Sequence, residues 1–406
     1  MIEKRRNPHR EEIVRKIALT IVASFAIFVA FELGLRIFGF KYPAMADTII
    51  VWSLKEDRLM EMGQSLHEES TKQLWKPRAG APVPWGEEDG EAINALGLRG
   101  PALTVEPAEG VVRIAALGDS STFGMGVKAD ETYIAQLGAL LADAPKPVEI
   151  INGGVIGYTL RQGIHRYEEV ISPLKPRIVI AAFGAVNEHL PTLDLADREK
   201  IDKRAKVTTL DRGLSWLRDS VRILHFASFW SDLVHGVDRG EIRTELFEDR
   251  QERRRMNVAA GKARWPGTRR MSPKRFRESL LEIAQAVHKD GGRLIYLSMP
   301  RHPKKEEENP ILLEYSRALT GFAEARRAPL LDVRRLVYDA IEEGATWEEL
   351  FVDNYHPSPA GHALIAAALN DMIRELMANE GGAGGAAGGQ QMSDAEKRAR
   401  AARKRR

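Results

Sequence analysis

The sequence predicts an α/β domain in which a mostly parallel sheet is covered by helices on both faces. Three observations lead to this fold class. Five short apolar runs have the length and flanking residues of buried strands, helical patterns lie between them, and polar, glycine-rich turns follow several of them. Because parallel strands need long crossover connections, alternation of strands with helices favours a parallel sheet.

The predicted strands are short and largely apolar, as strands buried on both faces of a sheet are. They are VVRIAAL at 111–117, PVEIING at 147–153, RIVIAAFG at 177–184, RLIYLSMP at 293–300 and APLLDV at 328–333. Helical patterns occupy 131–144 and 272–292. The second of these has Ser272 as its predicted N-cap and Pro273 at its first position, and it closes on two glycines.

Composition excludes several classes of protein. With 406 residues, 44% hydrophobic and 29% charged, the chain can bury a sizeable core and is not a disordered protein. The absence of cysteine excludes disulfides, thiolate catalysis and cysteine-bound metals. Basic residues concentrate at the two ends and in 199–277, but no zinc-finger, phosphate-loop or RNA-binding motif accompanies them, which argues against a nucleic-acid partner.

Residues 17–40, IALTIVASFAIFVAFELGLRIFGF, are predicted to cross a membrane as one helix. Glu32 and Arg36 are four residues apart, so they can pair on one helix face close to the far headgroups. The sequence AMA at 44–46 has the form of a signal-peptide cleavage site but lies too far beyond the apolar run, which favours an uncleaved anchor. The basic residues before the run predict a cytoplasmic amino terminus and an extracytoplasmic remainder.

Composition also divides the chain into segments. They are a basic cytoplasmic segment at 1–16, the anchor at 17–40, a connecting segment at 41–110, the main domain at 111–376 with an insertion at 188–271, and a tail at 377–406. We expect the connecting segment to pack on the main domain and the charged insertion to form helices that flank the site. The tail is rich in glycine, alanine and basic residues, so we expect it to be disordered.

The first predicted strand runs into ALGDSSTFGMG at 116–126, which places Asp119, Ser120 and Ser121 between two glycines. Such residues form ordinary turns. They can also present a serine hydroxyl at the carboxyl end of a strand, where open α/β sheets bind ligands. A serine nucleophile then needs a base to take its proton and donors for the oxyanion.

Three later blocks can supply these parts. In VDNYHPSPAGH, Asp353 precedes His356 by three residues, a spacing that lets a carboxylate fix the imidazole tautomer, and the prolines after His356 place it on a loop. We interpret His362, inside the following helix, as a packing or capping residue. INGGVIGYT at 151–159 can expose backbone N–H groups, and FGAVNEH at 183–189 puts the Asn187 amide at the end of the third strand.

In this order, GDSSTFG, NGGVIG, GAVN and DNYHP resemble blocks of the SGNH, or GDSL-type, hydrolase family across residues 111–376. The resemblance implies a flavodoxin-like three-layer sandwich, with Ser120 as nucleophile and His356 as general base oriented by Asp353. It also implies an oxyanion hole formed by Gly157, Asn187 and the Ser120 backbone N–H. Glu188 stands where the family usually has aspartate, a difference that concerns loop packing more than the reaction.

The anchor, with FELGLRIFG, and the later NALGLRG resemble a membrane-anchored bacterial branch of that family. The sequence therefore predicts a serine esterase, without metal or cofactor, at the outer face of the cytoplasmic membrane. Its substrate would be an acyl ester, such as an acetyl ester, of a cell-envelope lipid or polysaccharide. The sequence identifies neither the acyl chain nor the oligomeric state.

Two alternatives stay open. An O-acyltransferase would pass the acyl group to a sugar hydroxyl instead of water, and a catalytically inactive envelope-binding protein could use the same fold. The insertion contains Trp216, Trp230 and Trp265 and is large enough to form an acceptor wall for a transferase. Packing in the core or next to the membrane is the favoured interpretation of these tryptophans, so hydrolysis stays the first prediction.

Overall fold

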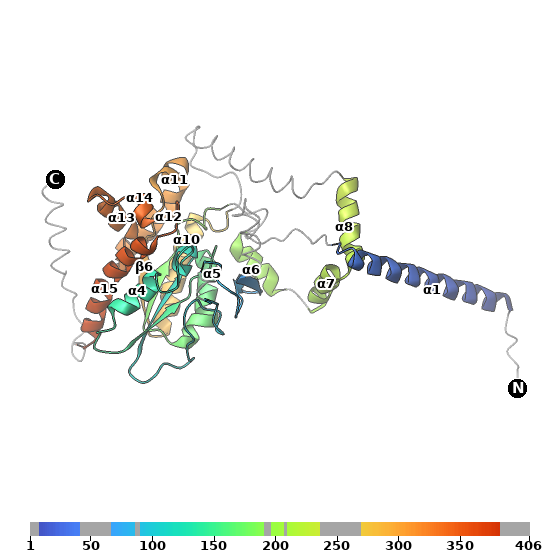
Figure 1. Cartoon of the computed structure of the whole chain (residues 1–406), viewed down its shortest axis with the longest axis horizontal. Helices are drawn as coiled ribbons and strands as arrows, with labels where there is room; N and C mark the ends of the chain where they lie inside the picture. Colours follow the sequence, from blue (N-terminus) through green and yellow to red (C-terminus); the bar gives the residue numbers. More distant parts are fainter. Residues whose placement is uncertain are drawn as a thin grey trace.

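Five parallel strands form the central sheet, in the spatial order β4-β3-β5-β6-β7 (Figure 1). The strands are β3 Val112–Gly118, β4 Val148–Asn152, β5 Ile178–Ala182, β6 Arg293–Leu297 and β7 Leu330–Leu331. They confirm all five predicted strands. The first strand of this sheet lies between the second and the third, which is the flavodoxin-like order, so the chain changes direction between β3 and β5. The carboxyl end of β3 therefore lies at the switch point where such sheets bind ligands.

The computed structural model describes residues 8–40, 66–85, 90–190, 196–206, 209–235 and 269–381. The predicted disordered tail falls almost entirely outside these ranges, as do residues 41–65 and the part of the insertion at 236–268.

Both faces of the sheet are buried, because alternate residues of each strand point to opposite sides. In β3, Ala115 and Leu117 belong to one hydrophobic cluster, whereas Ile114 and Ala116 belong to the other. All four are essentially inaccessible to solvent. This explains why the strands have no polar-apolar alternation in the sequence.

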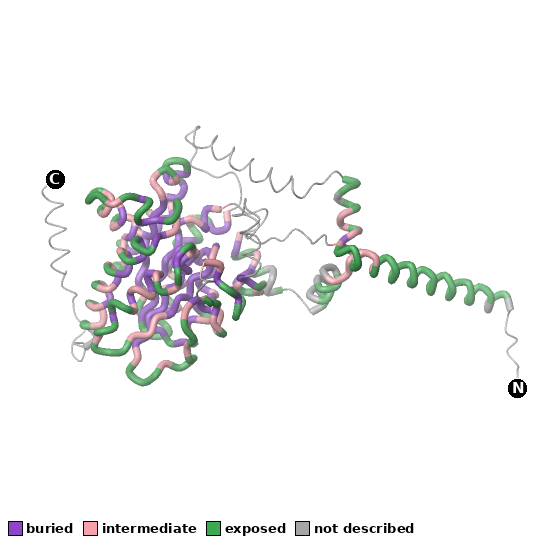
Figure 2. Tube along the Cα trace, in the orientation of Figure 1, coloured by how far each residue is buried: buried purple, intermediate pink, exposed green. Residues whose placement is uncertain are grey.

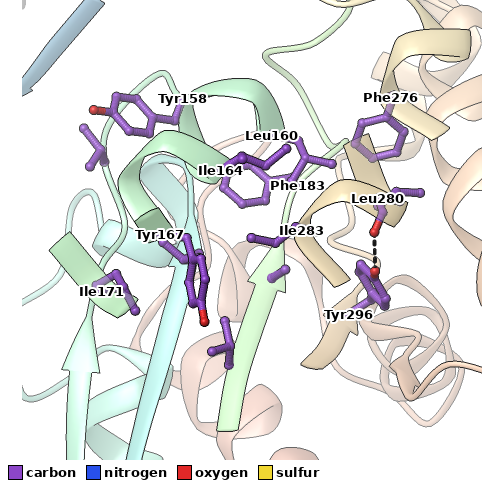
Figure 3. Close-up of a cluster of buried hydrophobic side chains, with 14 of the residues drawn as sticks. Tyr158, Leu160, Ile164, Tyr167, Ile171, Phe183, Phe276, Leu280, Ile283 and Tyr296 are labelled. Atoms are coloured by element: carbon purple, nitrogen blue, oxygen red, sulfur yellow. Dashed lines mark hydrogen bonds between the residues drawn. The ribbon is translucent and has the colours of Figure 1, made fainter. Parts of the chain in front are cut away.

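The first cluster lies under α5 Leu160–Arg166, α10 Pro273–Lys289 and α12 Ile311–Arg326. Figure 3 shows Phe183 of the loop after β5 between side chains of α5 and α10, with the Tyr296 hydroxyl donating to the Leu280 carbonyl at 2.6 Å. Ser272 caps α10 by accepting from the backbone N–H of Arg275 at 3.3 Å, as the sequence predicts.

The second cluster lies under α4 Tyr133–Leu140, α13 Val333–Glu342 and α15 Pro359–Gly381. Helices on both faces confirm the three-layer sandwich. The remaining elements of the main domain are short: α3 Ser120–Phe123, η3 Tyr167–Ile171, η4 Ser172–Leu174, α11 Pro303–Glu308 and α14 Trp347–Leu350.

The described part of the connecting segment, from residue 66 onward, packs on the main domain. It begins with a hairpin that the sequence pattern did not indicate, in which β1 His67–Ser70 pairs antiparallel with β2 Leu74–Pro77. Trp75 of this hairpin is buried and contacts Tyr158 edge-on, with 5.7 Å between the ring centroids. The segment therefore packs against the loop at 151–159, one of the predicted site blocks.

The long helix α1, Pro8–Ile37, projects away from the sheet (Figure 1). It begins before the predicted span of 17–40 and ends at Ile37, because the chain turns at Gly39 in the left-handed conformation. The most apolar stretch of 18 residues within residues 12–37 has a mean hydropathy of 2.2. Residues 12–31 are exposed, as Figure 2 shows, whereas Glu32, Gly34 and Leu35 near the end of the helix are partly buried. The helix is long and apolar enough to cross a membrane. The described part of the insertion is helical, with α6 Asp197–Ala205, α7 Thr209–Ser220 and α8 Arg222–Val234. The expectation that its helices flank the site is wrong for α7 and α8, which pack against the end of α1.

Candidate active site

Ser120 is the first residue of α3, a single helical turn that follows β3. Asp119 caps this turn by accepting from the backbone N–H of Ser121 at 3.0 Å. A Cβ at Gly118 would lie 2.0 Å from Thr122 Oγ1, so only glycine permits the strand to turn this sharply into the helix. Ser120 stays partly exposed while its neighbours on both sides are buried. The turn therefore presents the Ser120 hydroxyl at the carboxyl ends of the parallel strands.

Three of the predicted site side chains form one chain of hydrogen bonds. Ser120 Oγ lies 2.8 Å from His356 Nε2, and His356 Nδ1 lies 2.6 Å from Asp353 Oδ2. The carboxylate on Nδ1 selects the tautomer that carries its proton there, which leaves Nε2 to accept from the serine hydroxyl. Residues more than 200 positions apart in the chain thus meet with the geometry of a nucleophile, a base and an orienting carboxylate.

The loop that carries Asp353 is held by its own backbone. Asp353 Oδ1 accepts from the N–H groups of Tyr355 and His356, at 2.7 and 2.8 Å. Trp347 Nε1 donates to the Asp353 carbonyl at 2.8 Å. Burial acts to raise the pKa of Asp353, but the hydrogen bonds and charge of His356 outweigh it and leave that pKa below its ordinary value. The carboxylate is therefore ionised when the imidazole takes a proton.

Asn187 follows β5 and is almost fully buried beside the serine turn. Its Nδ2 donates to Asp119 Oδ2 at 2.9 Å. This bond uses one of the two hydrogens of the amide and fixes which end of the side chain is nitrogen, so the other hydrogen can serve a ligand. Burial raises the pKa of Asp119, against the opposing hydrogen bonds from Ser121 and Asn187.

Gly157 adopts the left-handed conformation at φ 77°, and both of its peptide groups are held by side chains that the sequence analysis did not single out. Trp75 Nε1 donates to the Ile156 carbonyl at 3.0 Å, so the N–H of Gly157, on the other side of the same peptide, is fixed in direction. Arg270 Nη1 donates to the Gly157 carbonyl at 2.6 Å. Arg270 is itself buried in an ion pair with Asp197, at 2.8 Å.

Arg99, from the block NALGLRG, binds backbone carbonyls at and after the end of the serine turn. Its guanidinium is buried and donates to the carbonyls of Phe123, Gly124 and Val127 at 2.5 to 2.8 Å. These carbonyls follow the last residues of α3 or belong to them, so the cation satisfies acceptors that a helix end leaves unpaired. Its pairing with Glu91 could not be read from the sequence, because both partners lie in a stretch without periodicity.

His362 has the structural role that the sequence analysis assigned to it. Its Nδ1 accepts from the Tyr133 N–H at 3.1 Å, and its ring stacks on the Tyr133 ring. Burial lowers the pKa of His362 to about 3, so the imidazole is neutral near pH 7. This histidine packs α15 against α4 and does not belong to the site.

Glu188, next to Asn187, is buried and accepts from the Leu160 N–H at 3.1 Å, which ties the loop after β5 to the start of α5. Burial raises its pKa to about 7, and the charge of Asp119 acts in the same direction. The departure from the usual aspartate thus places an acid with a raised pKa inside the wall of the site, where it organises the loop.

Glu188→Gln is expected to change how stability depends on pH. In the wild type the folded state holds the Glu188 proton more tightly than the unfolded chain. Its stabilising effect is therefore complete below the ordinary pKa of 4.5 and is lost as pH rises through about 7. Glutamine keeps the acceptor for Leu160 but does not titrate. Denaturant unfolding in detergent should show the variant gaining about 3 kcal/mol over wild type across that interval. Glu348→Gln, the same change at an exposed residue, should follow wild type, and parallel curves for Glu188→Gln would contradict the expectation.

A cleft of about 860 Å³ lies between α5, α6 and α10, and Ser120 and His356 are not among its lining residues. Its lining is mostly charged, with Arg161 and Glu282 paired across it at 2.7 Å. Arg270 contributes to this cleft and to the Gly157 loop, so the two regions share one wall. Within the described ranges no cluster of three or more histidine, aspartate and glutamate side chains is placed to bind a metal ion.

The chain matches one family model and is similar to several solved structures. The family model of GDSL-like lipases and acylhydrolases matches residues 116–364, and no curated protein sequence matches the chain. Similar solved structures include a lipase/acylhydrolase from Enterococcus faecalis, 17% identical, covering 65% of this chain and 96% of that one, with a TM-score of 0.40. An acetylxylan esterase from Geobacillus stearothermophilus is 15% identical and covers 64% of this chain and 94% of that one, also with a TM-score of 0.40.

The matched family region begins within the last residues of β3, just before the serine turn, and ends inside α15, just after the loop that carries Asp353 and His356. It therefore includes every residue that the sequence analysis assigned to the site, and it makes up more than half of the chain. This protein belongs to the GDSL-like lipase/acylhydrolase family of serine ester hydrolases.

Proposed function

We propose that the protein hydrolyses an acyl ester of a cell-envelope lipid or polysaccharide through an acyl-enzyme on Ser120. The observation that carries this proposal is the chain of hydrogen bonds from Ser120 through His356 to Asp353. It supplies a nucleophile, a base within 2.8 Å and an ionised carboxylate that stabilises the imidazolium. Membership of an acylhydrolase family gives the class of bond.

In the first half-reaction, Ser120 Oγ attacks the ester carbonyl carbon while His356 Nε2 takes the hydroxyl proton. The negative charge on the carbonyl oxygen is stabilised by the N–H groups of Gly157 and Ser120 and by the Asn187 amide. His356 then gives its proton to the departing alcohol oxygen, which leaves the acyl group on Ser120. In the second half-reaction a water replaces the alcohol, and the same proton transfers release the carboxylic acid and restore the hydroxyl.

The location of the substrate follows from α1. Its 30 residues span about 45 Å, more than the hydrocarbon core of a bilayer. We propose a single-pass anchor with its amino terminus in the cytoplasm, because lysines and arginines cluster in residues 1–16. The catalytic domain is then extracytoplasmic and faces envelope polymers and the outer leaflet.

Reporter fusions test this orientation. A phosphatase that is active only outside the cytoplasm, fused after Glu380, is expected to be active. A reporter that works only in the cytoplasm should be inactive at the same site, because one span separates it from the amino terminus. The opposite pair of results would place the catalytic domain inside the cell and remove envelope esters from the possible substrates.

Transfer to a sugar hydroxyl is the competing reaction, because His356 can activate either acceptor once the acyl-enzyme has formed. The predicted acceptor wall gains no support from Trp216 and Trp230, which lie on α7 and α8 rather than among the residues that contact Ser120. Trp230 stacks on Phe226 near the end of α1, in line with the membrane-proximal interpretation. Trp265 lies outside the described residues.

Partitioning of the acyl group separates the two reactions. With an activated acetyl ester, we expect acetate release to be unaffected by added envelope oligosaccharides, because water is the proposed acceptor. The measurement combines acetate release with mass spectrometry of the sugars. The Ser120→Ala variant controls for uncatalysed transfer. Acetylated sugar that grows at the expense of acetate would overturn hydrolysis in favour of transfer.

A further inference from the structure

The helices α7 and α8 contact the end of α1 rather than the sheet (Figure 1). The carboxylate of Glu32 accepts from the backbone N–H groups of Arg222 and Ile223, at 3.0 and 2.9 Å, and so caps the first turn of α8. Arg36 pairs with Glu32 at 2.8 Å and donates to the carbonyl of Ser220, the last residue of α7, at 2.6 Å. The two charges inside the apolar helix thus bind the junction between α7 and α8.

Aromatic packing reinforces this contact. Phe226 of α8 meets Phe31 of α1 edge-on, with 5.1 Å between ring centroids. Phe40, just after α1, contacts both Phe226 and Phe229, at 5.9 and 5.8 Å. Because α8 runs across the end of α1, a bilayer crossed by α1 would have α8 lying along its surface (Figure 1).

Among the described side chains of α7 and α8, eight large apolar residues are exposed. Trp216 is 67% exposed and Trp230 is 56% exposed. The other exposed large apolar residues of the two helices are Leu210, Leu214, Leu217, Leu224, Leu233 and Val234. On α7, the leucines at 210, 214 and 217 recur at helical spacing, so they form one face. Exposed apolar groups of this extent mark a surface that binds something.

We propose that residues 209–235, here called the membrane collar, lie in the headgroup region of the bilayer that α1 crosses. The bilayer is the occupant that the contacts favour, because the exposed apolar surface of the collar continues the exposed apolar surface of α1 at the end where that helix leaves the membrane. Tryptophan is enriched at this depth, and amphipathic helices lie there with their apolar faces down. The inference depends on the proposed span of α1 and not on the ester chemistry.

The collar explains two features that the anchor alone leaves open. A glutamate and an arginine at the end of a membrane helix become the cap of an interfacial helix, so neither charge has to face lipid alone. The insertion at 188–271 also connects the membrane surface to the site. The collar follows α6, whose first residue Asp197 pairs with Arg270, and Arg270 holds Gly157.

Spin labels test the location of the collar in the full-length protein. Since the chain has no cysteine, Leu214→Cys and Leu233→Cys each create a single labelling site in the collar. Ala23→Cys reports on α1, and Glu342→Cys on α13 reports on a water-exposed part of the catalytic domain. In nanodiscs of phosphatidylethanolamine and phosphatidylglycerol, collision rates with oxygen, which partitions into lipid, are compared with those of a water-soluble nickel chelate.

We expect the ratio of oxygen to nickel collisions at Leu214 and Leu233 to exceed that at Glu342 several-fold and to approach that at Ala23. A ratio equal to that at Glu342 would place the collar in water and overturn the proposal. Low rates with both reagents would mean burial against protein, a second copy or another partner, and would also overturn it. A water-exposed Ala23 would overturn the anchor and the collar together, while leaving the esterase activity untouched.

A second variant tests the coupling to α1. Glu32→Ala removes the acceptor for the first turn of α8, so we expect the Leu233 label to gain nickel collisions several-fold while the Ala23 label is unchanged. Glu12→Ala is the matched control, because Glu12 lies on the same helix and pairs with Lys16 at 2.9 Å. Identical collision rates in the Glu32→Ala variant and in wild type would contradict the role of Glu32 as a cap.

Discussion

Replacing Ser120 with alanine is expected to lower kcat for ester hydrolysis on the order of 10⁴- to 10⁶-fold, because the proposed acyl-enzyme cannot form without the hydroxyl. The fold should be retained, since Ser120 is partly exposed on a turn whose glycines and cap stay in place. Steady-state hydrolysis of a p-nitrophenyl ester by the purified full-length protein measures the first effect. Thermal unfolding measures the second.

Ser121→Ala is the matched control, because it removes the same hydroxyl one residue further along. Ser121 Oγ donates to the Tyr355 carbonyl at 3.3 Å and is buried. We expect this variant to keep most of its activity. If the Ser121 variant loses activity and the Ser120 variant keeps it, the assignment of the nucleophile is wrong.

Asn187→Ala is expected to lower kcat by roughly 100- to 1,000-fold with a modest change in KM, because the amide hydrogen bond strengthens as charge develops on the carbonyl oxygen. The change also removes one hydrogen bond from the buried Asp119 carboxylate, so we expect a stability loss of about 1 to 3 kcal/mol. Kinetics well below the unfolding temperature separate the two effects.

Asn94→Ala provides the comparison for stability. The Asn94 side chain accepts from Leu96 and Leu98 and donates to Pro101, so it organises a loop without contacting the serine turn. Similar stability loss with nearly normal kcat is expected there. A rate defect in Asn187→Ala that disappears once the folded fraction is accounted for would show that Asn187 is a turn residue only.

The sheet, and the meeting of the polar residues that follow two of its strands, could be predicted for the same physical reason. Strands buried on both faces must be apolar along their length, so β3, β5 and β6 stand out from the charged segments between them. Neighbouring parallel strands have their carboxyl ends on the same side of the sheet, so the polar residues that follow β3 and β5 must lie close together. The closeness of Asn187 to Asp119 could be expected from those positions, and the pairing of His356 with Asp353 from their spacing. The approach of His356 to Ser120 was an implication of the family resemblance.

Residues that hold the site from a distance could not be predicted. Trp75, Arg99 and Arg270 act on backbone carbonyls, and a carbonyl gives no sequence signal about its partner. Trp75 belongs to a hairpin without clear alternation of polar and apolar residues. Arg270 lies near the end of a charged insertion, and nothing in the sequence distinguishes it from the other arginines there. Such contacts depend on the assembled fold, because they join segments about 25 to 115 residues apart.

The contact of α1 with α8 was missed for a related reason. Glu32 and Arg36 were correctly predicted to pair with each other, because a spacing of four residues brings them together on a helix. Their second partners are the backbone groups of Ser220, Arg222 and Ile223, which lie 184 to 191 residues away in the chain.

Covalent labelling of Ser120 tests the central claim most directly. A fluorophosphonate reacts with a serine hydroxyl only where a base and an oxyanion hole activate it, so it reports the complete site in a single step. Peptide mass spectrometry of the labelled full-length protein distinguishes Ser120 from Ser121 by fragmentation. We predict stoichiometric modification at Ser120 that is lost in His356→Ala. Modification at another serine, or none in a folded wild-type protein, would contradict the assignment of Ser120 as nucleophile.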